Sequence, residues 1–179
     1  MGKITRVKPV KLIIGFIFKE EMTFKKAKRI LTGKFGKIDF ESEDIPFNFT
    51  DYYRPEFGEN LKRAFVSFRK LIYPKHLPLV KVMTNGIEEK LSLGKKRLIN
   101  IDPGYLDLAK LVLASTKDYA HRVYLDKGIF AEITLSFKGN SFRAKEWTYP
   151  DYRTEGYIMI FNKIRGIYSD NLCQLTPEG

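Results

Sequence analysis

An α+β fold is predicted for this chain of 179 residues by two patterns. Up to residue 101, the apolar alternation typical of strands is interrupted twice by the three-to-four spacing typical of amphipathic helices. From Lys110 onward, short strand-like segments follow one another, and a single helical pattern closes the chain. Strands and helices in such runs, without strict alternation, indicate an antiparallel sheet with helices packed on it.

The elements of the first part follow the order strand, helix, strand, strand, helix, strand. They are a strand at 12–18, a helix from Thr23 to Gly33 or Gly36, strand segments at 38–40 and 45–49, a strand at 61–71, a helix after Pro78 that stops at Gly94, and a strand at 97–101. This order is that of the ferredoxin-like βαββαβ core, in which an antiparallel sheet carries both helices on one face.

The second part predicts a β-meander and a closing helix. Strands are expected at 110–115, 121–125, 129–137 and 142–147, and a helix at the apolar stripe Tyr157, Ile160, Phe161, Ile164 and Ile167. No repeat or linker separates the two parts. We therefore expect one domain over residues 1–179, with a basic N-terminal arm at 1–10.

Composition limits the classes of function. The formal net charge of +11 favours association with RNA or with anionic small molecules. Because no apolar run reaches about 18 residues, we expect no membrane span. Cys173 is the one cysteine, which excludes an internal disulfide and fits a cytoplasmic protein. A charged fraction of 30% with a single glutamine is a bias of heat-adapted proteins.

Two hairpin turns set the expected strand register. A three-residue loop at 126–128 with Gly128 in the left-handed position pairs Leu125 with Ile129 and Arg122 with Glu132. The corresponding pairs are Tyr124 with Phe130 and Val123 with Ala131, and a turn at Gly139-Asn140 adds Phe137 with Phe142, Leu135 with Ala144 and Glu132 with Trp147. Arg122, Glu132 and Trp147 then form a row on one face, and His121, Ile133 and Glu146 a row on the other.

Each row has a functional and a structural interpretation. The pair Arg122 and Glu132 could hold an anionic or planar ligand against Trp147, or it could be an ordinary cross-strand ion pair covered by an aromatic ring. His121 could act as an acid-base group, with Asp102 or Glu132 orienting it, or could be a core histidine. Asp102 opens the sequence Asp-Pro-Gly-Tyr, which predicts a turn.

Recognised cofactor motifs are not found. Two histidines, His76 and His121, lie too far apart for a known ligand spacing, so no metal site is predicted and no cofactor is indicated. The segment 33–37 lacks the spacing of a phosphate-binding loop. The stretch 64–68 fits the second half of the strand signature of RNA-recognition motifs, but Lys62 and Arg63 break the first half, and a core strand explains it better.

Five motifs together resemble a small prokaryotic family. They are Thr50–Tyr53, Asn100–Leu106, Leu113–Asp118, His121-Arg122 and Trp147–Arg153. In combination they are similar to the domain-of-unknown-function family 4416, over roughly residues 8 to 170. The resemblance implies a stand-alone cytoplasmic protein and marks the region of a site, without implying an activity.

Three hypotheses follow for the function. The first is a binding protein for a phosphorylated or otherwise anionic ligand, such as RNA or a nucleotide, with site residues Arg122, Lys117, Trp147, Tyr105, Tyr149, Asp151, Tyr152 and Arg153. The second is an enzyme with His121, Asp102 and Glu132 as its catalytic residues. The third is an assembly subunit, for example a homodimer, that covers an aromatic surface including Tyr157, Phe161 and Tyr168.

Overall fold

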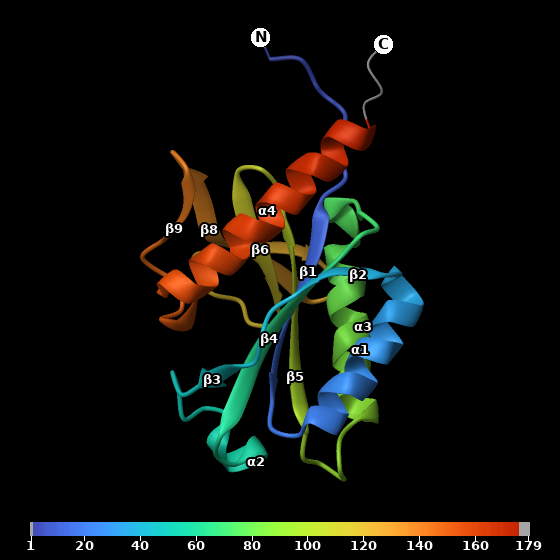
Figure 1. The fold of residues 1–179 in the computed structure, drawn as a ribbon, viewed down its shortest axis with the longest axis vertical. Coiled ribbons are helices and arrows are strands. Elements are labelled where there is room, and N and C mark those ends of the chain that lie inside the picture. The colour runs from blue at the N-terminus through green and yellow to red at the C-terminus, as the bar shows by residue number, and fades with distance from the viewer. Residues whose placement is uncertain (1, 176–179) are drawn as a thin grey trace.

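The computed structural model describes residues 2–175, in which one nine-stranded sheet carries helices on both faces (Figure 1). The strands are β1 (Lys11–Phe18), β2 (Ile38–Glu41), β3 (Ile45–Phe47), β4 (Leu61–Phe68), β5 (Ile99–Leu106), β6 (Lys110–Ser115), β7 (Val123–Asp126), β8 (Ile129–Lys138) and β9 (Ser141–Ala144). The helices are α1 (Glu21–Phe35), α2 (Arg54–Phe57), α3 (Leu77–Lys90) and α4 (Glu155–Leu175). Mixed helices and strands with antiparallel pairing confirm the α+β class.

The strands lie in the order β2-β4-β1-β5-β6-β8-β7, with β3 also on β4 and β9 also on β8. The C-terminal strands therefore depart from the expected meander, because β6 skips β7 and pairs with β8. The length of β8 explains the difference. Its first half pairs with β7 and its second half with β9, while β6 pairs along its other edge.

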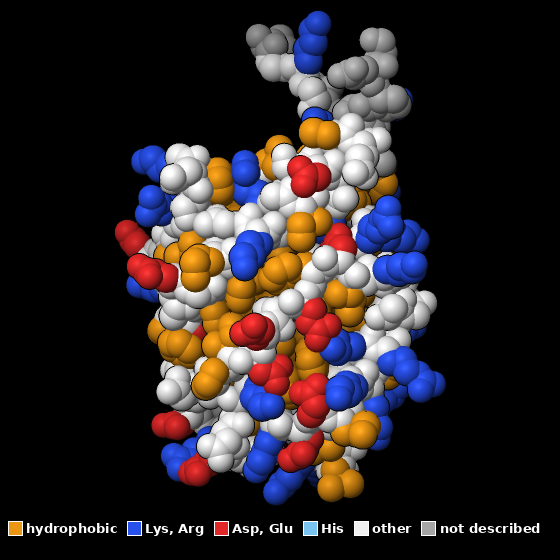
Figure 2. Space-filling view, viewed as in Figure 1, with side chains coloured by type: hydrophobic (Ala, Val, Ile, Leu, Met, Phe, Trp, Pro, Cys, Tyr) orange, Lys and Arg blue, Asp and Glu red, His pale blue; other side chains and the backbone are white. Residues whose placement is uncertain are grey.

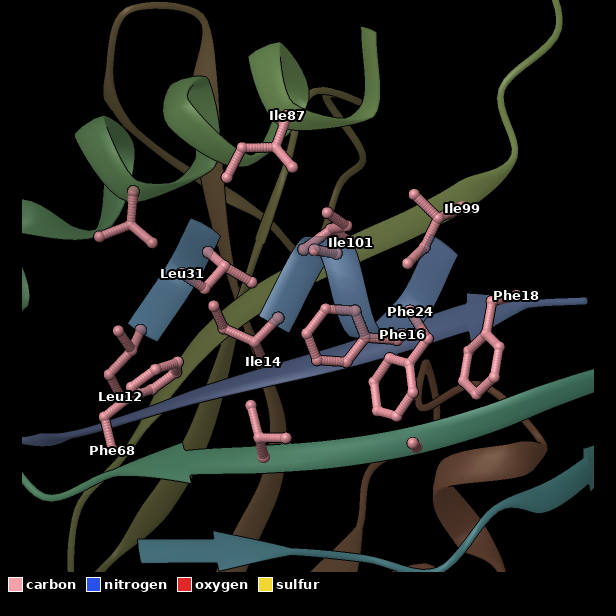
Figure 3. Packing of buried hydrophobic residues seen from close by; sticks show 14 residues of the cluster. Leu12, Ile14, Phe16, Phe18, Phe24, Leu31, Phe68, Ile87, Ile99 and Ile101 are labelled. Carbon is pink, nitrogen blue, oxygen red and sulfur yellow. The ribbon is translucent and has the colours of Figure 1, made fainter. Parts of the chain in front are cut away.

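Helices α1 and α3 cover one face of the sheet. Alternate residues of β1 point toward them, and Figure 3 shows Phe16 and Phe18 against Phe24 of α1, with Ile87 of α3 above Ile101. Phe18 and Phe24 stack at 4.3 Å between ring centroids. Each such buried side chain stabilises the fold by about 1.5–3 kcal/mol.

Helix α4 covers the opposite face and crosses the sheet diagonally (Figure 1). Phe65 of β4 packs edge-to-face against Tyr157 and Phe161, and Ile13 of β1 belongs to the same cluster. Tyr157, Phe161 and Tyr168 are 1%, 0% and 2% exposed. The expectation that these three rings form a surface for a partner is therefore wrong, because the chain's own sheet covers them.

The hairpin registers are largely confirmed. Val123 pairs with Ala131, Tyr124 with Phe130, Phe137 with Phe142 and Leu135 with Ala144. The expected Leu125–Ile129 pair is wrong, because Asp126 pairs with Ile129 across a two-residue turn in which Lys127 and Gly128 both have positive φ. A shift at Leu125 adds one residue to that strand, so the rest of the hairpin keeps the register that a three-residue loop would give.

Two other local predictions are wrong. Strand β9 ends at Ala144, so Trp147 lies beyond the ladder and does not pair with Glu132. Asp102-Pro103-Gly104-Tyr105 is not a turn but lies inside β5, where Asp102 pairs with Gly15 of β1. Within residues 2–175, no helix is both long and apolar enough to cross a membrane.

Candidate functional site: a polar cleft between β5 and β6

Strands β5 and β6 pair over only three residues and then separate. The ladder joins Gly104, Tyr105 and Leu106 to the facing residues of β6, and no pair is formed nearer the start of β5. Pro103 precedes the ladder and has no N–H to donate. At the last pair the backbones are so close that a Cβ on Gly104 would lie 2.5 Å from the Val112 carbonyl oxygen. Toward the start of β5, that strand stays paired with β1 while β6 stays paired with β8. The two strands therefore diverge and leave a cleft between them.

The cleft encloses about 360 Å³ and is lined mainly by polar side chains. Helix α3 contributes Lys81, Asn85, Glu88 and Glu89, the β5 side contributes Arg97, Asn100 and Asp102, the end of β6 contributes Ala114, Ser115, Thr116 and Lys117, and Tyr52, Tyr53, Arg122 and Tyr149 complete the wall. Polar groups from segments far apart in the sequence thus meet at one opening of the sheet, which is a common place for a ligand site.

Asp102 is the centre of the cleft. Asn100 donates to its Oδ2 at 2.6 Å, Arg63 Nη1 lies 3.5 Å from Oδ2, and Lys81 Nζ lies 3.5 Å from Oδ1. Lys81 also donates to the Ile101 carbonyl at 3.0 Å. The carboxylate therefore joins two buried cations, while its own side chain remains 27% exposed to the cleft.

Arg63 reaches Asp102 because Gly15 lies between them on β1. A Cβ at Gly15 would meet the Phe65 ring at 3.1 Å and the Arg63 guanidinium carbon at 3.5 Å. Arg63 Nη2 donates to the Tyr152 hydroxyl at 2.6 Å and lies 3.7 Å from Asp151. Burial raises the pKa of Tyr152 and of Asp151, and the guanidinium opposes both shifts.

A second ion network closes the base of the cleft. Arg97 donates to both oxygens of Glu56, at 2.9 and 2.7 Å, and to Glu88 at 3.1 Å. Glu88 also accepts the Ile101 N–H at 2.7 Å. Burial raises the pKa of Glu88, whereas the hydrogen bonds from Arg97 lower the pKa of Glu56. These carboxylates are therefore occupied by donors from within the chain.

A second hollow of about 470 Å³ adjoins the polar cleft. Seven of its lining residues are aromatic, namely Phe47, Phe49, Tyr52, Tyr53, Tyr119, Tyr149 and Tyr152. It shares Tyr52, Tyr53, Asp102, Lys117 and Tyr149 with the polar cleft. We call the two parts the polar half and the aromatic half of one continuous cleft.

The predicted ion pair of the hairpin is confirmed. Arg122 donates to Glu132 Oε2 from Nε at 2.9 Å, and its Nη2 lies 2.8 Å from the same oxygen. Its Nη1 donates to Ser115 Oγ at 2.7 Å and to the Lys117 carbonyl at 3.1 Å. Both charged side chains are 3% exposed. Arg122 thus fixes the loop after β6 and has few donors left for a ligand.

His121 and Trp147 lie together, although they were expected on opposite faces. Their rings stack at 5.5 Å, and His121 Nε2 lies 3.1 Å from Glu132 Oε2. The alternation of faces does not apply, because His121 lies in a turn before β7 and Trp147 lies after β9. Nor is His121 in the core, since its side chain is 24% exposed. Asp102 makes its bonds in the cleft instead of orienting His121.

The other predicted residues fall into three groups. Lys117 and Tyr149 line both halves of the cleft, and Asp151 and Tyr152 lie deeper in the aromatic half. Arg153 donates to the carbonyls of Thr148 and Glu146, both at 2.7 Å, and so stabilises the turn before α4. Tyr105 lines a separate hollow with Tyr168 and Asp107, outside the cleft.

Sequence reasoning missed Arg63, Lys81, Glu88 and Arg97. A signal for three of them was present, because each is a charge inside an otherwise buried element. Arg63 lies in a strand of apolar neighbours, and Lys81 and Glu88 lie seven positions apart, next to buried Val80 and Ile87. Among residues 2–175, no cluster of three or more His, Cys, Asp or Glu side chains is placed to hold a metal ion.

The fold and the cleft together define an α+β protein with a polar and aromatic site at a divergence in its sheet. A family model described as "Domain of unknown function (DUF4416)" matches residues 8–168, and the chain belongs to this family. No curated protein and no solved structure matches the chain.

Proposed function

We propose that this protein binds a small molecule carrying an anionic or acceptor-rich group in the polar half of the cleft. The observation that carries the proposal is an imbalance between donors and acceptors. The carboxylates of Asp102, Glu88 and Glu56 are occupied by donors of the chain. Lys117 has no acidic partner among the described residues, and its ammonium group lies 4.6 Å from the centre of the Tyr52 ring.

Further donors face the same space. The Asn85 side chain has no hydrogen-bond partner in residues 2–175 and lines the polar half beside Lys81. Lys81 has three N–H groups, of which one is donated to the Ile101 carbonyl at 3.0 Å, and its ammonium group also pairs with Asp102 at 3.5 Å, so one N–H remains for a ligand. Glu89 at the wall is a carboxylate without a described partner, which limits the net positive charge of the site. A ligand with one or two negative charges, and not a long polyanion, fits this balance.

Titration calorimetry with inorganic phosphate, ribose 5-phosphate and adenosine monophosphate tests the proposal. We expect binding by at least one of these, weakened about 10-fold or more in Lys117→Gln, since a hydrogen bond to a charged group contributes about 1.5–3 kcal/mol. Lys138→Gln is the matched control, because Lys138 is exposed on β8 and outside the cleft. No binding of any probe, or equal loss in both variants, would contradict the proposal.

RNA as the ligand has weaker support. Sheets that bind RNA stack bases on exposed aromatic residues, but Phe65 is 1% exposed beneath α4. Figure 2 shows lysine and arginine side chains scattered over the α4 face, with hydrophobic and acidic side chains between them. If RNA binds to this face, substitution of basic residues in α4 should reduce retention of the protein on heparin. Retention that instead depends on Lys117 would favour the cleft.

An enzyme that uses His121 is a second candidate, favoured by one observation. The Nε2 atom of a part-exposed His121 lies 3.1 Å from the buried carboxylate of Glu132, an arrangement that orients an imidazole for proton transfer. Arg122 shares that carboxylate, which weakens the case. A turnover assay should then show loss in His121→Gln, and activity retained by that variant would exclude this role.

The fold supports two further proposals. We infer a ferredoxin-like core, supported by the antiparallel order β2-β4-β1-β5 with α1 and α3 on one face. A cytoplasmic location is supported by the single cysteine. Fractionation of the native host tests the second point.

A further inference from the structure

We propose that the aromatic half of the cleft takes a planar ring, so that the ligand is a ring joined to an anionic group, as in a mononucleotide. The inference rests on the proposed function for the anionic group and adds the other end of the molecule. The inference is drawn from residues of the aromatic half, whereas the proposed function is drawn from the hydrogen bonds of the polar half.

Several rings in this half are held at the surface although ring burial would stabilise the protein. Tyr52 is 61% exposed, Tyr149 is 47% exposed, and Tyr119 and Phe49 are also exposed at the same hollow. Burial of an aromatic side chain is among the largest apolar contributions available to a fold. A group of exposed rings around one hollow is therefore expected where another flat group packs against them.

A buried cation lies beneath the hollow. Arg63 lines it, and its guanidinium lies 4.9 Å from the Phe65 ring centre and 5.1 Å from that of Tyr152. Its Nε is buried and has no hydrogen-bond acceptor within residues 2–175. Because the Arg63 side chain is only 2% exposed, a ligand in the hollow does not reach Nε, and the guanidinium acts on a ring through its charge.

The two halves meet where the ring of such a ligand would be joined to its anionic group. Lys117 and Tyr149 line both halves, with the Lys117 ammonium close to Tyr52. A ring seated among the tyrosines therefore places its attached phosphate or carboxylate beside Lys117. The hollows of about 360 and 470 Å³ together fall within the range of about 300–1,000 Å³ usual for small-molecule sites.

The test compares matched probes by titration calorimetry: adenosine, guanosine, uridine and flavin mononucleotides, ribose 5-phosphate, and adenosine. We expect at least one mononucleotide to bind about 5- to 100-fold more tightly than ribose 5-phosphate, as stacking of one ring predicts. Tyr149→Ala should remove most of this advantage, Tyr149→Phe should keep it, and ribose 5-phosphate should bind both variants as it binds the wild type. Tyr124→Ala, which removes an exposed ring outside the cleft, is the control.

The outcomes separate the two proposals. If ribose 5-phosphate binds as tightly as every mononucleotide, or if Tyr149→Ala has no effect, the ring inference is overturned while the anionic site stands. If adenosine binds as tightly as its monophosphate and Lys117→Gln changes neither, the ring inference stands and the anionic site fails. Circular dichroism of each variant shows whether its fold is retained, and Tyr149→Leu, which also removes the ring, replaces Tyr149→Ala if the latter unfolds.

Discussion

The cleft between β5 and β6 and the cluster around Glu132 contain similar residues but differ in how completely their bonds are used. In the cluster, Glu132 accepts from Arg122 and from Thr134, and Arg122 spends its remaining donors on the loop after β6. In the cleft, the Lys117 and Asn85 side chains have no hydrogen-bond or acidic partner among the described residues, and Lys117 contacts only the ring of Tyr52. A saturated network stabilises structure, whereas an unsaturated one is available to a ligand.

The charged side chains of the two regions also differ in burial. Arg122 and Glu132 are both almost fully buried, so loss of either one leaves a charge in a low-dielectric environment. Asp102 remains in contact with the open cleft. Substitutions in the two regions should therefore affect different measurements, with stability dominating in the cluster and ligand binding in the cleft.

The largest expected effect is that of Glu132→Ala. The change leaves the buried Arg122 guanidinium without its carboxylate, which costs about 3–5 kcal/mol in the free energy of unfolding. Urea unfolding followed by circular dichroism measures it. Glu146→Ala, an exposed carboxylate in the same region, should change stability by less than about 0.5 kcal/mol. A cost below about 1 kcal/mol for Glu132→Ala would show that the cluster is not a saturated structural network.

The junction that closes the cleft should be the next most sensitive position. Gly104→Ala places a methyl group 2.5 Å from the Val112 carbonyl oxygen and 2.7 Å from Leu113 Cδ2, so the β5–β6 ladder must shift at a cost of about 1–3 kcal/mol. Gly166→Ala is the control, because nothing lies within 4 Å of a Cβ there and alanine favours helix α4 by about 0.8–1 kcal/mol. Equal thermal midpoints for the two variants would contradict this account.

A smaller effect is expected in the dependence of stability on pH. Burial raises the pKa of Asp151, so the folded protein keeps a proton that the unfolded chain releases near its ordinary pKa of 3.8. The free energy of unfolding therefore falls as pH rises through the interval between 3.8 and the raised pKa. In Asp151→Asn this contribution is absent, so the stability of the variant minus that of the wild type should increase with pH.

Glu56 provides the opposite sign for the same experiment. Hydrogen bonds from Arg97 lower its pKa, so its contribution is present above the ordinary pKa of 4.5 and is lost as pH falls through the lowered pKa. The stability of Glu56→Gln minus that of the wild type should therefore decrease as pH rises. Urea titrations from about pH 3 to pH 7 distinguish the two slopes, and parallel slopes would refute the assigned causes.

The smallest expected effect on stability is that of Lys117→Gln. Among residues 2–175 its ammonium group contacts only the face of exposed Tyr52, so the free energy of unfolding should stay within about 0.5 kcal/mol of the wild type. The same variant is expected to lose ligand affinity, as described above. Destabilisation by more than about 1 kcal/mol would place Lys117 with the structural residues of the cluster.

The sequence predicted most of the helices and the hairpin registers, because apolar periodicity and turn residues act locally. It placed the pair Arg122 and Glu132 correctly for the same reason. It did not predict the cleft, because Asp102 gains its role from Arg63 and Lys81, which are distant in the sequence. The Pro103-Gly104 pair was interpreted as a turn, since the contact that requires glycine inside β5 involves the backbone of another strand.

The position of α4 also affects how the chain folds during its synthesis. The ribosome completes β1, β4 and β5 before residues 155–175 exist, so Ile13 and Phe65 have no cover on that face in the nascent chain. Until Tyr157 and Phe161 emerge, the incomplete sheet exposes an aggregation-prone apolar surface of the kind that chaperones bind. The site therefore cannot reach its final shape before residue 152 has been synthesised, since the Arg63 guanidinium donates to the Tyr152 hydroxyl.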